Sequence, residues 1–115
     1  MKAEELRIGN LVNVDEKAYK ISGGDIYNLE NYNKNYGHLY KPIPLTEEWL
    51  EKFGFMQPDS NYLIWEKQGF KPFCILFEAL INHWQIGVYG GRVFKRIKYV
   101  HQLQNLYFAL TEKEL

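Results

Sequence analysis

Glu78 and Cys74 are the residues whose side chains come closest to a reactive setting. Glu78 lies within an apolar run, where a carboxyl group could serve as a general acid or base. We favour the simpler interpretation that it faces solvent on a half-buried strand. Cys74 would need exposure and a nearby base to act as a nucleophile, and its neighbours Phe73 and Ile75 predict a small core residue instead.

The three histidines show no spacing typical of a metal site. His38, His83 and His101 are widely separated, and a single cysteine cannot form a thiolate cluster. We expect His38 to be solvated in a loop and His101 to be exposed on the side of the last helix away from the core. No nucleophile elbow, P-loop or dinucleotide-binding glycine motif occurs. The sequence therefore predicts no catalytic residue, metal or cofactor, and an enzyme stays open only if Glu78 and a histidine converge.

A basic strand is the first surface that could bind a ligand. Arg92, Phe94, Arg96 and Lys98 would share one face of this strand, and Lys95 would project from the other. Cations interleaved with an aromatic ring can follow a phosphate backbone and stack a base, which makes nucleic-acid binding one alternative. We favour the other alternative, an edge strand whose lysines and arginines prevent edge-to-edge pairing.

The far side of the last helix is the second such surface. His101, Gln104, Asn105 and Phe108 project opposite the predicted core stripe. An aromatic ring there either packs on another part of the chain, the interpretation that we favour, or meets a partner, which is the best functional lead. Amides around an aromatic ring are typical of protein interfaces, so these four residues are the predicted partner-binding set.

Composition limits the class of protein. The chain has 115 residues, which suffice for one core, and 46% of them are hydrophobic. Fourteen basic and fourteen acidic residues cancel, whereas general nucleic-acid binders usually carry a basic excess. We find no signal peptide and no apolar run long enough to span a bilayer, so we expect a cytoplasmic protein without membrane contact.

The first part of the chain reads as short strands that form a curled meander. We expect the turn Gly23-Gly24-Asp25 to join the last two of these strands, and the asparagine-rich stretch Asn31–Gly37 to be a loop. An extended connector follows and ends at two prolines. The three expected strands are Leu11–Val14, Ala18–Ile21 and Ile26–Leu29.

A short helix begins after Thr46 and carries signals at both ends. Thr46 is a favourable N-cap, and Glu47 and Glu48 place negative charge at the positive end of the helix dipole. Adjacent helical residues diverge by about 100°, so these carboxylates cannot share a proton. Gly54 suits the left-handed position after the helix, and Phe55 can pack back onto Leu50.

The remaining elements form a second antiparallel meander and a final amphipathic helix. Phe73–Leu80 could be a strand or a helix, and we favour a strand because strands flank it. The other expected strands are Tyr62–Glu66, Trp84–Tyr89 and Arg92–Ile97, the last two joined by a turn at Gly90-Gly91. The expected helix spans Lys98–Leu110. Its predicted core stripe consists of Tyr99, Val100, Leu103, Leu106, Tyr107 and Leu110.

Three segments together resemble a known family: Glu5–Val12, Ile43–Leu50 and Ile97–Leu110. They are similar to small uncharacterised proteins of prophages and mobile regions in gut bacteria. The resemblance implies a bacterial or phage setting and an accessory role, and it carries over no activity or site residue. The stretch Arg7–Glu30 is also similar to the opening strands of a small SH3-like barrel, a fold that mostly binds proteins or nucleic acids.

We therefore expect one α+β domain spanning residues 1–115, with an N-terminal strand lobe (1–44) and a C-terminal lobe (45–115). The predicted function is a non-enzymatic protein-binding or adaptor module that contacts another protein or a second copy of itself. The alternatives are a nucleic-acid-binding module that uses the basic strand, and a small enzyme or enzyme inhibitor.

Overall fold

The computed structural model describes residues 1–58, 64–78, 83–88 and 93–115, with only the backbone at Val93 and Phe94. Its helices and antiparallel strands make the chain an α+β protein, as predicted. The chain forms two units. The first unit combines Met1–Pro44 with Tyr99–Leu106, which the sequence had assigned to the C-terminal lobe, and the second combines Leu45–Lys98 with Tyr107–Leu115.

The first unit contains a two-stranded antiparallel hairpin. Its strands are β1 (Leu11–Val14) and β2 (Lys17–Lys20), which agree with the first two predicted strands to within one residue. Asp15 and Glu16 form the turn with φ angles of 51° and 63°. Left-handed angles at both central residues are what a type I′ hairpin turn requires.

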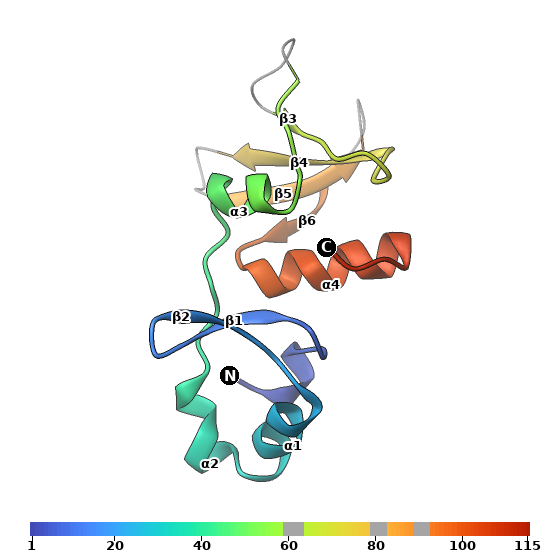
Figure 1. Cartoon of the computed structure of the whole chain (residues 1–115). Helices are drawn as coiled ribbons and strands as arrows, with labels where there is room; N and C mark the ends of the chain where they lie inside the picture. The colour runs from blue at the N-terminus through green and yellow to red at the C-terminus, as the bar shows by residue number, and fades with distance from the viewer. Residues whose placement is uncertain (59–63, 79–82, 89–92) are drawn as a thin grey trace. The chain divides into compact units, whose positions relative to one another are not determined.

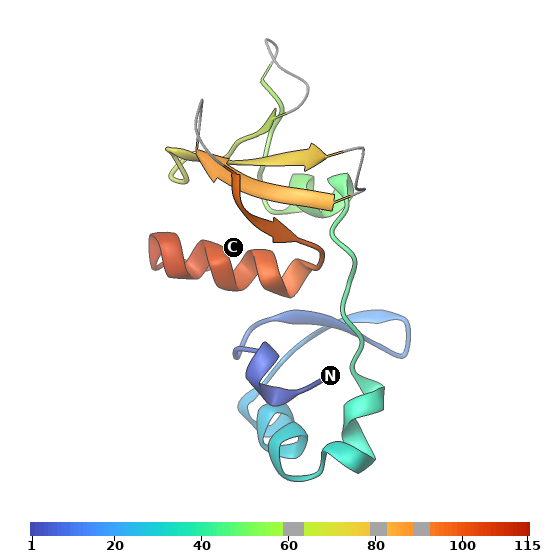
Figure 2. The same ribbon diagram turned by 180° about the vertical axis from the view of Figure 1, so that it is seen from behind.

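Helices, and not a third strand, follow the hairpin. The predicted strand Ile26–Leu29 is wrong, because it lies inside helix α1 (Gly23–Asn31). The predicted loop Asn31–Gly37 is also wrong, since it includes helix α2 (Asn33–Tyr36), followed by the 3-10 turn η2 (Gly37–Leu39). The expected N-terminal meander is therefore replaced by a hairpin with two helices on one side of it (Figures 1 and 2).

The physical reason is a capping box that the sequence reading mistook for a hairpin turn. The hydroxyl group of Ser22 accepts a hydrogen bond from the backbone N–H of Asp25, and the Asp25 carboxylate accepts one from the N–H of Ser22. This reciprocal pair starts α1. Leu29 then points into a small core with Val12, Ile21 and Tyr40.

The second unit holds a four-stranded antiparallel sheet (Figure 1). Neighbouring strands in the chain are neighbours in the sheet, in the order β3-β4-β5-β6. The strands are β3 (Ile64–Trp65), β4 (Phe73–Glu78), β5 (His83–Val88) and β6 (Val93–Ile97). The preference for a strand at Phe73 is confirmed within this range. The predicted turn Gly90-Gly91 lies outside the described residues.

Helix α3 (Glu47–Lys52) confirms the helix predicted from its end signals. Thr46 accepts a hydrogen bond from the N–H of Trp49, and Gly54 adopts a φ angle of 88°. The N–H of Gly54 bonds the carbonyl of Glu51, and the N–H of Phe55 bonds the carbonyl of Leu50, each at 2.9 Å. This pair of bonds is the Schellman motif.

The last helix, α4 (Val100–Thr111), confirms the amphipathic C-terminal helix. Val100, Leu103 and Tyr107 are buried, which matches the predicted core stripe. Its beginning belongs to the first unit and its end to the second. Among the described residues, no helix is long and apolar enough to cross a bilayer.

Candidate functional site

Of the reactive residues proposed from the sequence, Glu78 and His83 lie opposite each other on neighbouring strands. Cys74 is buried as predicted, and burial together with the charge of Glu66 raises the pKa of its thiol group. Glu78 is half-buried and lies opposite His83 in the β4–β5 ladder, at the end of the hairpin. His38 and His101 belong to the first unit. Within the described ranges, no three potential metal ligands form a group that could hold an ion.

Gln104 and Asn105 form hydrogen bonds with the N-terminal segment of the first unit. The Gln104 side chain accepts a bond of 2.8 Å from the N–H of Leu11 and donates one of 3.4 Å to the carbonyl of Gly9. Asn105 Oδ1 accepts a bond of 2.8 Å from the buried amide of Asn10. These amides therefore act as partners for the strand that begins at Leu11.

His101 is buried, so its predicted exposure is wrong. Only 4% of the residue is exposed, and its ring stacks on Tyr99 with centroids 5.8 Å apart. Burial lowers the pKa of His101, and the opposing charge of Glu5 only partly offsets this effect. In the described part of the chain, its Nδ1 atom has no hydrogen-bond partner. Phe108 is 38% exposed, and partner binding by the predicted set stays a prediction.

The basic strand is an edge strand among the described strands, since β6 ends the sheet. Lys95, Arg96 and Lys98 are exposed, whereas Arg92 and the side chain of Phe94 lie outside the described residues. Lys95 stands opposite the buried Ile86, so its exposed side chain starts from the core face of the strand, and a register shift follows at Gly87. Inward-pointing charges and bulges are devices that protect a sheet edge from pairing.

Three tyrosines form an exposed row on the helices of the first unit, which we call the tyrosine surface. Tyr27 is on α1, Tyr32 lies between the two helices, and Tyr36 ends α2. Their exposed fractions are 58%, 48% and 38%. The rings of Tyr27 and Tyr32 meet edge to face with centroids 6.2 Å apart, and those of Tyr32 and Tyr36 do so at 6.5 Å.

Asp25 fixes the start of the helix that carries this surface. Its buried carboxylate accepts hydrogen bonds from the hydroxyl groups of Tyr40 at 2.7 Å, Ser22 at 2.7 Å and Tyr19 at 2.8 Å. Burial by itself would raise the pKa of Asp25, but these bonds, with that from the Ser22 N–H, outweigh burial and lower the pKa. Asp25 is therefore an ionised anchor between α1, the end of the hairpin and Tyr40.

Sequence reasoning missed both the tyrosine surface and its anchor. Tyr27 lies in the segment predicted as a strand, and Tyr32 and Tyr36 lie in the asparagine-rich stretch predicted as a loop, so no sequence pattern placed the three rings together. The signal that could have revealed them is the Ser22–Asp25 capping box, because it places Tyr27 and the residues after it on helices.

No protein-family model matches the chain, and neither the curated proteins nor the solved structures include a significant match.

Proposed function

We propose that this protein is a non-enzymatic binding module that recognises another protein, or a second copy of itself, through the tyrosine surface. The observation that carries the proposal is the mutual contact of three tyrosine rings that are all substantially exposed. Tyrosine combines a large apolar ring with a polar hydroxyl group, and it is enriched at the energetic centres of protein interfaces.

The surface is held in place before any partner arrives. The N–H of Tyr32 bonds the carbonyl of Asn28 at 2.7 Å, and the N–H of Tyr36 bonds the carbonyl of Tyr32 at 3.1 Å. The exposed Asn31 bonds the carbonyl of Tyr27 at 2.9 Å through its side chain. Ordered side chains lose less conformational entropy on binding, so this local order favours affinity.

The composition and charge of the surface favour a protein partner over a nucleic acid. Exposed tyrosines and asparagines together are typical of protein-binding loops in antibodies. Glu30 and Lys34, the charged residues of the segment, cancel each other. The rings of Tyr32 and its neighbours are tilted by 61° and 66°, whereas single-strand binding uses stacking platforms along a positively charged groove.

The resemblance of three segments to small prophage proteins supports an accessory role in a bacterial or phage setting. In such a role the module would attach to a partner and alter the partner's activity or location.

Site-specific photo-crosslinking tests the proposal. A benzophenone amino acid replaces Tyr32 in one variant and the exposed Phe77 of the second unit in a control variant, and both are irradiated in host lysate. We expect a discrete crosslinked protein, or a crosslinked dimer, from position 32 only. Adding Tyr27→Ser and Tyr36→Ser should abolish that product. Identical products from positions 32 and 77, or a product unaffected by the serine changes, would contradict the proposal.

A further inference from the structure

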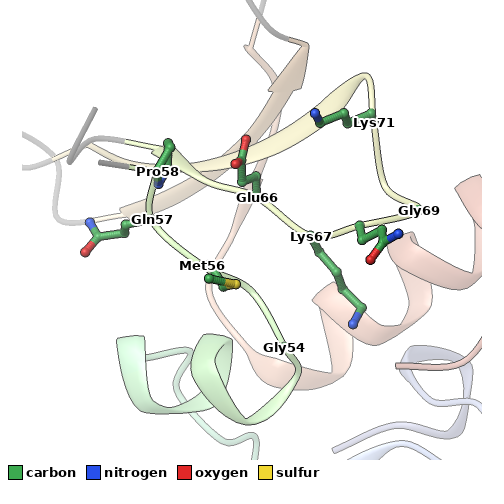
Figure 3. A pocket seen from close by; sticks show the side chains of 9 residues that line it. Gly54, Met56, Gln57, Pro58, Glu66, Lys67, Gly69 and Lys71 are labelled. Carbon is green, nitrogen blue, oxygen red and sulfur yellow. The ribbon is translucent and has the colours of Figure 1, made fainter. Parts of the chain in front are cut away.

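A pocket in the second unit is lined by charged and amide side chains (Figure 3). Its volume of about 690 Å³ falls within the range of roughly 300–1,000 Å³ typical of small-molecule sites. One wall comes from the segment after α3, at residues 54–58, and the other from residues 66–71. All of these residues belong to the second unit.

The two walls are joined by backbone bonds. The N–H of Met56 bonds the carbonyl of Glu66, and the N–H of Glu66 bonds the carbonyl of Met56, both at 2.8 Å. Beyond this bridge, the N–H of Phe70 bonds the carbonyl of Lys67 at 3.0 Å and closes a tight turn. Gly69 occupies the third position of this turn with a φ angle of 85°, as a type II turn requires.

Each wall is also anchored by a buried aromatic ring. Phe55 and Phe70 are fully buried and meet edge to face, with centroids 5.7 Å apart. The neighbours of Phe55 in the chain are Gly54 and Met56, and those of Phe70 are Gly69 and Lys71; all four line the pocket. The walls are therefore positioned by the core, which is the condition for a preorganised site.

The charges of the pocket favour an anion. Lys67 and Lys71 outnumber the one carboxylate, that of Glu66, although the whole chain is neutral. In Figure 3 the side chain of Lys67 extends toward Gly54, whereas Lys71 lies at the opposite edge, on the side of Glu66. The Lys67 ammonium would be only 2.8 Å from a Cβ atom at position 54, so glycine leaves room for this cation.

The rim of the pocket also offers apolar surface. Met56 is 70% exposed, the largest exposed fraction among the large hydrophobic residues described as exposed. A flexible thioether side chain adapts to apolar groups of different shapes. We infer that this pocket binds a small organic anion, with the Lys67 ammonium contacting the anionic group, Lys71 adding positive charge from the opposite edge, and Met56 contacting the apolar part.

Titration followed by two-dimensional ¹H–¹⁵N NMR of the full chain tests the inference. Phenyl phosphate and benzoate serve as probes, inorganic phosphate as the charged control and benzyl alcohol as the apolar control. We expect the amide signals of Gly54 and Gly69 to shift with either probe at about 10 mM, a concentration that reveals even millimolar affinity. The probe that binds with the higher affinity identifies the preferred anionic group as phosphate or carboxylate.

Charge-removing variants separate a site from non-specific attraction. Lys67→Gln with Lys71→Gln should weaken probe binding roughly tenfold or more, because charge-assisted bonds are lost. Lys71→Gln alone should weaken it in part without affecting the end of α3. Lys41→Gln, in the first unit, should bind as the unmodified chain does. Absent shifts, equal shifts with benzyl alcohol, or undiminished binding by the double variant would overturn the inference.

Discussion

The hydroxyl group of Tyr40 donates a hydrogen bond of 2.7 Å to Oδ1 of Asp25, and both residues are buried. Burial and the charge of Asp25 both raise the pKa of Tyr40, so its hydroxyl group stays protonated and remains a donor. The bond connects the end of the helical segment to the first turn of α1. The Tyr40–Asp25 bond therefore helps to fix the position of α1, the helix that carries Tyr27 of the tyrosine surface.

Removing this hydroxyl group should destabilise the protein. Tyr40→Phe keeps the buried ring but deletes a bond to a charged acceptor, for which we expect a loss of about 1.5–3 kcal/mol in the free energy of unfolding. Tyr19→Phe, which deletes a bond from a partly exposed residue to the same carboxylate, is the matched control and should cost less. Urea unfolding measures both. An equal or smaller loss for Tyr40→Phe would contradict this account.

Asp25 should give the protein a stability component that disappears in acid. Its pKa in the folded chain lies below the unfolded value of about 3.9, so the component is complete above that value. It is lost as the pH falls through the lower, folded pKa. Unfolding experiments at pH values from 6 down to 2 should therefore show a steeper decline for the unmodified chain than for Asp25→Asn. Parallel declines would show that Asp25 does not act in this way.

His101 should make the free energy of unfolding depend on pH in a second, higher pH range. Because burial lowers its pKa below the usual 6.5, the neutral ring stabilises the folded chain fully above about that pH. This stabilisation declines as the pH falls below 6.5. We expect His101→Gln to flatten the stability profile between pH 7 and pH 5. An undiminished slope between pH 7 and pH 5 in His101→Gln would refute the role of His101.

Gln104 should contribute more to the free energy of unfolding than an exposed glutamine does. Gln104→Ala leaves the N–H of Leu11 without its acceptor, and we expect a cost of about 1–3 kcal/mol. Gln68→Ala removes an exposed amide and should change the free energy of unfolding by less than about 0.5 kcal/mol. Thermal or urea unfolding distinguishes the two. If both variants were neutral, Gln104 would not be a significant contributor.

Lys95 should prevent self-association through the edge of the sheet. Lys95→Val replaces the charge opposite Ile86 with a residue that favours strands, so we expect dimers or larger species in sedimentation velocity. Lys113→Val, in the exposed C-terminal segment, is the control with the same change of charge. A monomeric Lys95→Val variant would mean that other features protect the edge.

Local signals in the sequence predicted the second unit better than the first. The start and end of α3 follow from Thr46 and Gly54, whose effects depend only on adjacent residues. Alternation likewise predicted β5, whereas β4 was predicted from its residue types and from the strands that flank it. In the first unit, Ser22 and Asp25 formed a capping box, but the intervening Gly23-Gly24 favoured a hairpin turn equally well. The helix is selected over the hairpin turn by the hydrogen bonds that Tyr19 and Tyr40 donate to Asp25. Such tertiary contacts cannot be recognised from the residues next to Asp25 in the sequence.

The candidate sites were harder to predict, for a related reason. Helical periodicity placed His101 and Gln104 away from the core stripe, but it could not reveal that the N-terminal segment bonds that side. The pocket depends on the Met56–Glu66 bridge, which joins residues ten positions apart. The tyrosine surface depends on two helices: Gly23-Gly24 read as a turn at the start of α1, and the asparagine-rich stretch read as a loop at α2.

The alternation of buried rings and outward side chains around the pocket has a consequence for protein engineering. The contact between the buried rings of Phe55 and Phe70 fixes the two loops. Met56, Gln68 and Lys71, which lie next to these phenylalanines or two residues away in the sequence, are exposed. A library randomised at those three positions, with both phenylalanines and Gly54 retained, would vary recognition while sparing the core. The second unit thus offers a scaffold on which new ligand specificities can be selected.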